Sequence, residues 1–521
     1  MPRTHRATRS ANYLLGCVHA HPVLGVVRNG HCGFGGAKHL WMWAVLAVVG
    51  GMATSVRAQE PGGLPAVAAI EQATVEAIAA AEKSVVAIAR IQKGQPGDDF
   101  TPEFRLDPFG RAPNRPSPQA ESATAEYATG VVIDRQGLIL TAYHVLGENS
   151  DYFITTWERK TYRAVVKAAD PRSDLAVLAV EAADVELMPI VLGDASRVRK
   201  GQFVIALGNP FAIARDGQVS ASWGIVANLN RKAAPASVDP DPAARSTLHH
   251  FGTLIQTDAK LNLGTSGGAL INLRGEMVGL TTSLAAVSGY EQAAGYAFPV
   301  DETFRRVLDT LKQGREVEYG YLGVQPGNLS AMEVRDGIRG ARIQHVVPGG
   351  PADRYGLEVE DIVTSVNGEP VYDADSLVLS VGRLPVESKV NLSVVRNQRL
   401  RTVSVVLSKY PVQGKKIVTV LEPSWRGLRV DYASAVPETS SLGLTAVTFL
   451  GEGVIVTDVE QGTPAWQAGL RPYDLVSHVD RTAIRSPREF RTAVSNRTGA
   501  VRLRLVSADG SAPVRIVEPG S

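Results

Sequence analysis

Short apolar stretches separated by turn residues dominate the chain between residues 84 and 300. The stretches are rich in Val, Ile and Leu and are followed by Gly, Pro, Asp or Asn, with no long helical pattern between them. Many short strands at this spacing predict an all-β barrel or sandwich. The predicted strands are 84–89, 130–133, 138–141, 152–155, 175–180, 203–207 and 277–280.

Helical periodicity flanks this β region on both sides. Residues 66–83 are Ala-rich with apolar positions at helical spacing, and residues 301–312 show the same period. The apolar face of the second helix comprises Phe304, Val307, Leu308 and Leu311. Residues 94–124 are dense in Pro, Gly and charge, which predicts a loop.

The chain repeats itself after residue 318. The sequence PADRYGL begins at Pro351 and PAWQAGL begins at Pro464, while Asp361-Ile362-Val363 is echoed by Asp474-Leu475-Val476. Both matches are 113 residues apart. A constant offset over so long a period predicts two copies of one domain rather than a stacked solenoid.

The amino-terminal 58 residues have the features of an export signal. The longest apolar run lies at residues 40–53, follows Lys38, and is short for a membrane-spanning helix. Val56-Arg57-Ala58 resembles a signal-peptidase site. We therefore interpret residues 1–58 as a signal peptide or leader, with an uncleaved membrane anchor at residues 40–53 as the alternative.

Composition narrows the function further once the leader is set aside. The leader contains six basic residues and no acidic one, and the whole chain has a net charge of +2, so the remainder is acidic. An acidic body gives no electrostatic reason to expect nucleic acid as a partner. Both cysteines, Cys17 and Cys32, lie in the leader, so the mature chain would have no disulfide and no cysteine nucleophile.

Three residues in the β region have the types needed for nucleophilic catalysis. Ser266 lies in the glycine-rich sequence Gly264-Thr265-Ser266-Gly267-Gly268, which allows a sharp turn that exposes the hydroxyl. His144 follows one apolar strand and Asp174 precedes another. A serine needs a base and the base needs a carboxylate, so we expect these three side chains to form a triad. The backbone N–H groups of Gly264 and Ser266 would form the oxyanion hole.

The order His144, Asp174, Ser266 is that of the chymotrypsin-like proteases. Four segments, TAYHVL, DPRSDLAVLAV, VIALGNPF and QTDAKLNLGTSGGALINLRGEMVGL, resemble the protease domain of the HtrA (DegP-like) family in the family's own order. The two repeats resemble its PDZ domains. In the first repeat, Leu322, Gly323 and Val324 match the loop that receives a peptide's terminal carboxylate.

The resemblance implies a mostly β protein with a chymotrypsin-like double β-barrel followed by two PDZ domains. The expected boundaries are 1–58 for the leader, 59–83 for an amino-terminal helix, 84–315 for the protease domain, and 318–412 and 425–515 for the PDZ domains. The family also implies an exported, periplasmic endopeptidase that degrades misfolded proteins and assembles through trimers. The substrates and partners would be unfolded proteins and apolar carboxyl-terminal peptides.

Several positions depart from the family pattern. Thr265 and Leu263 replace the usual Asn and Pro near the nucleophile, and Ala128-Thr129-Gly130 replaces a Gly-Ser-Gly. In the second PDZ domain we align Gly427-Leu428-Arg429-Val430 with the carboxylate loop, so that Arg429 takes a glycine's place. A Cβ at a position with positive φ would strain this loop, although a cation there could also pair with a carboxylate. These departures leave open a catalytically silent chaperone or scaffold that acts through PDZ binding.

The remaining features indicate neither a metal site nor a cofactor. His249 and His250 lie beside an Ala- and Pro-rich insertion at residues 232–246, with no carboxylate or cysteine cluster near them in the sequence. We interpret them as residues of a solvated loop. His345 and His478 fall at strand-like positions in the repeats. Residues 279–285, which should line the specificity pocket, are neutral, which favours cleavage after small or medium aliphatic residues.

Overall fold

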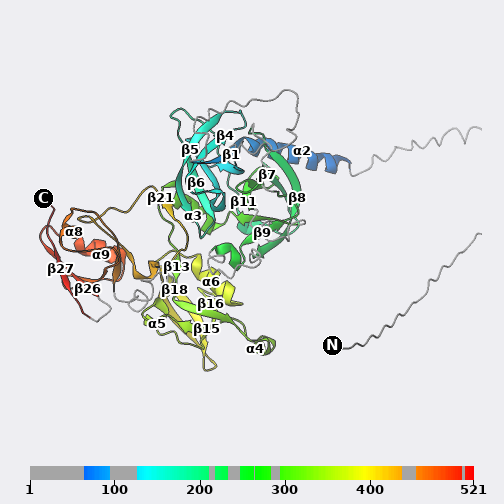
Figure 1. The fold of residues 1–521 in the computed structure, drawn as a ribbon. Coiled ribbons are helices and arrows are strands. Elements are labelled where there is room, and N and C mark those ends of the chain that lie inside the picture. Colours follow the sequence, from blue (N-terminus) through cyan, green and yellow to red (C-terminus); the bar gives the residue numbers. More distant parts are fainter. Residues whose placement is uncertain are drawn as a thin grey trace, which may run out of the picture. The chain divides into compact units, whose positions relative to one another are not determined.

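The computed structural model describes residues 64–93, 126–209, 217–232, 247–262, 264–282, 294–436, 453–506 and 511–520. The described residues from Ala66 onward belong to one unit of the chain, whose helices and strands are drawn in Figure 1. In this part of the chain, no helix combines the length and the apolar character needed to cross a membrane. The expected signal core at residues 40–53 and the expected loop at 94–124 lie outside the described residues.

Two closed six-stranded antiparallel barrels form the first half of the described chain, which confirms the predicted fold class. The first barrel has the strand order β5-β4-β1-β2-β3-β6 and closes through pairing of β5 with β6. Its strands are β1 (Val85–Gln92), β2 (Glu126–Val132), β3 (Leu138–Ala142), β4 (Ser150–Thr155), β5 (Thr161–Asp170) and β6 (Leu175–Val180).

The second barrel has the order β10-β11-β12-β9-β8-β7. Its strands are β7 (Phe203–Gly208), β8 (Ser220–Arg231), β9 (Leu254–Thr257), β10 (Ala269–Ile271), β11 (Met277–Thr282) and β12 (Gly295–Pro299). Short 3-10 turns interrupt the two barrels at η2 (Tyr143–Val145), η3 (Ala195–Arg197) and η6 (Leu248–Phe251). All the predicted strands are present, whereas the sequence did not predict β5, β8, β9, β10 or β12.

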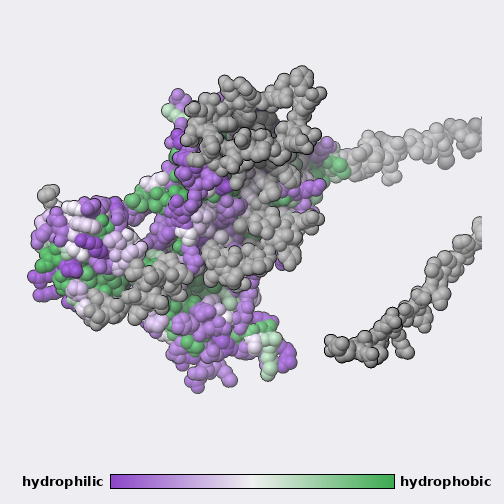
Figure 2. Space-filling model, viewed as in Figure 1, coloured by the Kyte–Doolittle hydropathy of each residue, from purple (hydrophilic) through white to green (hydrophobic). Residues whose placement is uncertain are grey.

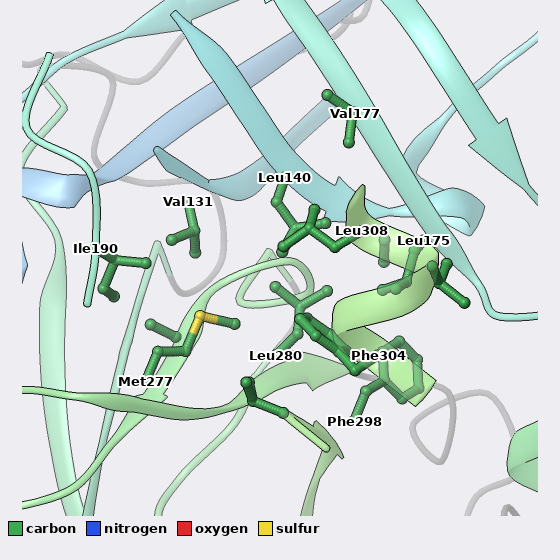
Figure 3. Close-up of a cluster of buried hydrophobic side chains, with 14 of the residues drawn as sticks. Val131, Leu140, Leu175, Val177, Ile190, Met277, Leu280, Phe298, Phe304 and Leu308 are labelled. Atoms are coloured by element: carbon green, nitrogen blue, oxygen red, sulfur yellow. The ribbon is translucent and has the colours of Figure 1, made fainter. Parts of the chain in front are cut away.

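One apolar core joins the two barrels to the flanking helices α2 (Leu64–Ala81) and α3 (Glu302–Lys312). The predicted face of α3 is buried, and Asp301 caps the helix by accepting the Phe304 N–H at 2.8 Å. Figure 3 shows Phe304 and Leu308 of α3 beside Leu280 and Phe298 of the second barrel. The space-filling view shows that the described surface on this side is mainly hydrophilic, with scattered apolar residues (Figure 2).

The two repeats fold as similar small units, each with its own core. The first contains β13 (Gly320–Tyr321), β14 (Val324–Asn328), α4 (Ala331–Arg335), β15 (Ala341–Val346), α5 (Pro351–Arg354), β16 (Ile362–Val366), β17 (Glu369–Pro370), α6 (Ala374–Gly382), β18 (Lys389–Arg396), β19 (Arg399–Val406) and β20 (Ser408–Lys409). Its sheet order, β14-β15-β16-β18-β19, leaves β14 at an edge.

The second repeat has the sheet order β22-β23-β24-β26-β27, with β22 at an edge. It contains β22 (Leu428–Tyr432), β23 (Val454–Val459), α8 (Pro464–Gln467), β24 (Leu475–Val479), β25 (Thr482–Ala483), α9 (Pro487–Val494), β26 (Val501–Val506) and β27 (Val514–Val517). A two-residue strand, β21 (Ile417–Val418), lies between the repeats and pairs with β5 of the first barrel.

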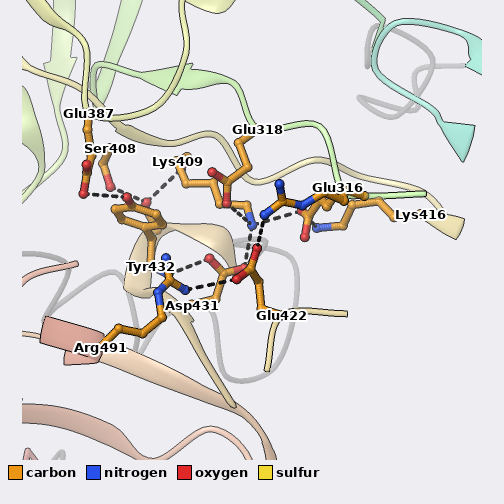
Figure 4. A network of polar contacts seen from close by, with 12 residues as sticks. Glu316, Glu318, Glu387, Ser408, Lys409, Lys416, Glu422, Asp431, Tyr432 and Arg491 are labelled. Atoms are coloured by element: carbon orange, nitrogen blue, oxygen red, sulfur yellow. Dashed lines mark hydrogen bonds and ion pairs between the residues drawn. The ribbon is translucent and has the colours of Figure 1, made fainter. Parts of the chain in front are cut away.

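A buried lysine links three parts of the chain. The Lys409 side chain is only 2% exposed, and its ammonium lies 2.7 Å from Asp431, 3.0 Å from Glu316 and 3.2 Å from Glu318 (Figure 4). Burial lowers the pKa of Lys409, but the three carboxylates outweigh burial and leave the pKa raised. Lys409 therefore stays charged and neutralises carboxylates that would otherwise repel one another.

We expect Lys409→Met to lower the free energy of unfolding by about 2 kcal/mol or more, because it leaves three acidic groups without their shared cation. Glu316 and Glu318 are partly exposed, so water can solvate them in the variant. The loss of unfolding free energy should therefore be smaller than for a fully buried ion pair. Lys416→Met is the matched control, since Lys416 contacts Glu316 at 2.7 Å but is 29% exposed, and it should cost less than about 1 kcal/mol. Equal losses in urea unfolding would contradict this interpretation.

Candidate active site

The ladder between β3 and β6 brings His144 and Asp174 together. Ala142, the last residue of β3, pairs with Leu175, the first of β6. His144 therefore lies two residues beyond this end of the ladder, and Asp174 lies one residue before the same end. The His144 Nδ1 lies 2.7 Å from Asp174 Oδ2, and the His144 backbone N–H donates to Asp174 Oδ1 at 2.9 Å.

The backbone holds this pair from a second direction. The Tyr143 N–H donates to the Asp174 carbonyl at 2.8 Å. Asp174 has a φ of 55°, a left-handed conformation that Asp adopts more readily than most residues. Its side chain is 3% exposed, while that of His144 is 32% exposed. The carboxylate is thus enclosed, and the imidazole keeps one side open to solvent.

Electrostatics favour a protonated Nδ1 on His144. Burial lowers the pKa of His144, but the negative charge of Asp174 and its hydrogen bond outweigh burial and raise the pKa above its ordinary value of 6.5. A carboxylate at Nδ1 holds the proton on that nitrogen and leaves Nε2 as the basic atom. The pair is therefore arranged to take up a proton at Nε2.

The serine turn needs its glycines. Gly264 and Gly267 have φ values of 90° and 83°. A Cβ on Gly267 would lie 2.2 Å from the Thr129 carbonyl oxygen, so only glycine fits there. The Thr129 N–H in turn donates to the Ser266 carbonyl at 3.1 Å. The turn from the second barrel is thereby bonded to β2 of the first barrel.

Two threonines fasten this contact between the barrels. Thr129 Oγ1 donates to the Gly264 carbonyl at 2.7 Å and accepts the Asn209 N–H at 2.9 Å. Thr141 Oγ1 donates to the Thr129 carbonyl at 2.8 Å, and Thr141 lies three residues before His144. A continuous path of hydrogen bonds therefore runs from the serine turn to the strand that carries the histidine.

Thr265, one of the departures from the family pattern, supports the turn internally. Its hydroxyl donates to the Asn262 carbonyl at 2.6 Å, and Thr281 Oγ1 donates to the Thr265 carbonyl at 2.5 Å. The Thr265 side chain is thus folded into the turn. Leu263, the other departure in this segment, lies outside the described residues.

His249 is buried, which contradicts the interpretation of residues 249 and 250 as a solvated loop. It is 7% exposed, and its ring stacks on Phe298 at 3.8 Å between centroids. Nε2 lies 2.8 Å from the Ser173 carbonyl and Nδ1 lies 2.6 Å from Thr253 Oγ1. A carbonyl only accepts, so Nε2 carries the proton and Nδ1 accepts from the threonine.

The partners of His249 are distant from it in the sequence, so no local pattern predicts its burial. Ser173 is 76 residues away in the chain, and Phe298 lies on β12. His249 thus supports the residue directly before Asp174. Burial lowers its pKa to about 4, so the ring is neutral near pH 7.

In the first repeat, the loop at Leu322, Gly323 and Val324 leads into the edge strand β14. The Gly323 carbonyl accepts the Val347 N–H at 2.9 Å, and the Leu322 carbonyl accepts the Ala352 N–H at 2.8 Å. Both carbonyls are thereby used within the repeat. In a trans peptide the N–H points opposite to the carbonyl, so the N–H groups of Gly323 and Val324 are directed away from these partners.

The alignment of Arg429 with a loop glycine is wrong. In the second repeat the Gly427 carbonyl accepts from Glu460 N–H at 2.8 Å, and the Arg426 carbonyl accepts from Ala465 N–H at 3.2 Å. These donors lie 113 residues after the donors in the first repeat. Gly427 therefore occupies the place of Gly323, and its φ of 82° matches the 77° there.

Arg426, not Arg429, is the unusual residue of the second loop. It occupies the place of Leu322, and its guanidinium donates to the carbonyls of Val517 at 2.7 Å, Gly499 at 2.7 Å and Arg497 at 3.0 Å. Arg429 lies on β22 and pairs with Glu460 at 2.8 Å and with Asp458. The expected backbone strain at Arg429 is absent, since its φ is not among the left-handed values of the described residues.

In the described part of the chain, no group of three His, Cys, Asp or Glu side chains is placed to hold a metal ion. The double barrel with a histidine–aspartate pair and a glycine-flanked serine defines a trypsin-like serine protease, followed by two small repeats.

Comparison with known protein families supports this class for the barrels and identifies the repeats. The family described as a trypsin-like peptidase domain matches residues 128–280, and the PDZ domain family matches residues 320–407 and 433–503.

Curated relatives extend the match over most of the chain. The probable periplasmic serine endoprotease DegP-like of Chlamydia muridarum (strain MoPn / Nigg) is 30% identical over 419 residues, covering 79% of this chain and 78% of the relative. The protein of the same name from Pseudomonas putida (strain GB-1) is 30% identical over 474 residues, covering 87% and 92%. A solved structure of the HtrA-type protease AlgW with decapeptide is 24% identical, covers 65% of this chain and 99% of that one, and has a TM-score of 0.48. The chain belongs to the DegP-like (HtrA) family of serine endoproteases.

The neutral state of His249 predicts a pH-dependent stability. Between pH 6.5 and about 4 the unfolded histidine binds a proton that the folded one does not, so the free energy of unfolding should fall as the pH falls, by about 3 kcal/mol. His249→Gln can still donate to the Ser173 carbonyl and should remove this contribution. His345→Gln, on an exposed strand position, is the control. Urea unfolding curves with the same pH dependence in wild type and His249→Gln would refute the assignment.

Proposed function

We propose that the chain hydrolyses peptide bonds through an acyl-enzyme, with Ser266 as nucleophile, His144 as general base and Asp174 as the group that orients the histidine. The hydrogen-bonded pair of His144 and Asp174, joined by the threonine path to the serine turn, is the observation that carries this proposal. The chemistry follows from the atoms involved.

In the first step the Ser266 hydroxyl attacks the substrate carbonyl and its proton passes to His144 Nε2. The resulting imidazolium is stabilised by Asp174. The backbone N–H groups of Gly264 and Ser266 would donate to the oxyanion. The proton then moves from Nε2 to the leaving amine. Water, deprotonated by the same nitrogen, attacks the acyl carbonyl, and this proton passes from Nε2 to Ser266 Oγ as the acyl group departs as a carboxylic acid.

The substrates we propose are unfolded or misfolded proteins of the periplasm, cleaved after small or medium aliphatic residues. The periplasmic names of the relatives and the signal-like residues 1–58 support an exported protein. We propose that residues 1–58 are a leader that is cleaved, with a membrane anchor at residues 40–53 as the alternative. We also propose that the protein assembles through trimers. Of the residues expected to line the specificity pocket, Thr281 and Thr282 are buried on β11, and residues 283–285 lie outside the described part.

We also propose that the first PDZ domain binds apolar carboxyl-terminal peptides at Leu322, Gly323 and Val324. Two features support this: the N–H groups of Gly323 and Val324 point away from the domain's own acceptors, and β14 is an edge strand to which a peptide can add. The Leu322 side chain is buried in the domain core and would form part of the apolar pocket floor. In the second domain, Arg426 takes this position, so the first domain is the better peptide site.

The triad should behave as one unit. His144→Ala and Ser266→Ala should each lower turnover of unfolded casein by about 10⁴-fold or more, and the double variant should be no slower than either single variant. Asp174→Asn should cost a similar or somewhat smaller factor, because it presents the wrong imidazole tautomer. Turnover within tenfold of wild type in Ser266→Ala would show that the nucleophile lies elsewhere.

Peptide capture by the first PDZ domain should require a free carboxylate. Full-length Ser266→Ala should bind a peptide ending in Val with micromolar or weaker affinity, about −8 kcal/mol at best, and bind its amide much more weakly. Gly323→Ala, made at a φ of 77°, should abolish binding, whereas Gly427→Ala, its counterpart in the second domain, should retain it. Equal affinity for acid and amide in calorimetry, or loss in Gly427→Ala alone, would overturn this assignment.

A further inference from the structure

The segment that joins the two PDZ domains, residues 410–420, contacts the protease domain beside the candidate catalytic pair. Its strand β21 extends the first barrel's sheet, with Ile417 opposite Ala169 and Val418 opposite Ala168 of β5. Thr419 Oγ1 also donates to the Lys167 carbonyl at 2.9 Å. The strand it holds ends at Asp170, four residues before Asp174.

A second contact reaches the histidine side of the pair. The Tyr143 hydroxyl donates to the Lys415 carbonyl at 3.1 Å. Tyr143 directly precedes His144, and its own N–H bonds to the Asp174 carbonyl. Gly414, with a φ of 94°, lies against Pro171, where an added Cβ would be 3.2 Å from the proline ring. The joining segment thus contacts both the segment that carries His144 and the segment that carries Asp174.

A third contact involves a buried arginine in the turn between β5 and β6. Arg172 is 1% exposed, and its guanidinium carbon lies 3.5 Å from the ring centre of Tyr410, which begins the joining segment. Such a desolvated cation over an aromatic face is a favourable contact. The Tyr410 N–H donates to the Tyr319 carbonyl at 2.8 Å, which fixes the backbone that carries this ring.

Asp170 completes this arrangement. Its Oδ2 accepts from the Ser173 N–H at 2.9 Å, from the Ser173 hydroxyl at 2.6 Å and from the Tyr319 hydroxyl. Burial raises the pKa of Asp170, while these hydrogen bonds and Arg172 act against burial. The turn 170–174 is therefore fastened to Tyr319, near the start of the first PDZ domain, and to Tyr410 of the joining segment.

We propose that the joining segment, residues 410–420, is a positioning element of the active site that keeps His144 and Asp174 paired. The proposal rests on the proposed triad. It differs from peptide capture, because none of the contacting residues belongs to the carboxylate loop or to β14. A displacement of about 1 Å in a catalytic group can cost two orders of magnitude in rate, so contacts this close to the pair can control turnover.

The variants follow from the three contacts. Tyr410→Leu removes the ring from Arg172, and the double variant Tyr143→Phe/Thr419→Val removes two hydroxyls with little change in shape. Two controls match them. Tyr410→Phe keeps the ring, and Lys415→Ala keeps the carbonyl that Tyr143 contacts.

Casein turnover measures the kinetic effect. Tyr410→Leu and the double variant should each lower kcat by about tenfold with KM changed less than about twofold, while both controls stay within about twofold of wild type. Unchanged kcat in a folded Tyr410→Leu or double variant, or an equal loss in Lys415→Ala, would overturn the proposal. Circular dichroism shows whether each variant is folded. If Tyr410→Leu fails to fold, the double variant, which keeps both side-chain shapes, tests the proposal alone.

Titration of the His144 ring by NMR, assigned with His144→Gln, gives a readout independent of turnover. The charged groups at this corner include Asp174 beside His144, Asp170, Asp174 and Glu148 around Tyr143, Arg172 in the turn 170–174, and Arg90, which donates to the Val145 carbonyl. Asp174 raises the pKa of His144, so a loosened pair should lower that pKa in Tyr410→Leu and the double variant. An unshifted titration in both would count against the proposal. Wild-type protein without turnover would instead refute the proposed function, and the titration would still test the positioning role.

Discussion

The hydrogen bond between His144 Nδ1 and Asp174 Oδ2 depends on how strands β3 and β6 pair. Because Ala142 lies opposite Leu175, His144 and Asp174 lie beyond the same end of one ladder. The backbone N–H groups of residues 143 and 144 also donate to Asp174, which adds two hydrogen bonds to the contact between the side chains. A shift of register by one residue would turn the side chains of either strand to the opposite face. Both faces of β6 are buried: Leu175 and Val177 lie in the core shared by the two barrels, and Leu178 lies in the first barrel's own core, so a one-residue shift would exchange residues between the two cores.

The second barrel contributes the serine turn, so the site exists only where the barrels meet. Thr129 connects them by bonding both the serine turn and the Asn209 backbone, while Gly267 allows a carbonyl of β2 to approach. The shared apolar core below this point holds the barrels together with α2 and α3. The active site is thus supported by packing beneath it and by hydrogen bonds across it.

The fold class could be predicted because buried strands leave a strong local pattern. β6 reads as a continuous apolar run, whereas β5 and β8 alternate with charged and polar residues that face solvent, and so were not recognised. The residue types and their order predict the three candidate catalytic residues. His249 was misjudged because its burial depends on Ser173 and Phe298, which are distant in sequence. Arg429 was misaligned because only strand pairing shows that the second loop is displaced relative to the repeated core.

We propose that Ser266 is a nucleophile activated by the His144–Asp174 pair. Treatment of the full-length protein with a fluorophosphonate, followed by mass spectrometry of its peptides, detects such a nucleophile. We expect a single covalent adduct on Ser266, formed at a rate that falls sharply in His144→Ala. An adduct on another serine, or no adduct in the folded wild-type protein with several such probes, would contradict it and favour a catalytically silent scaffold.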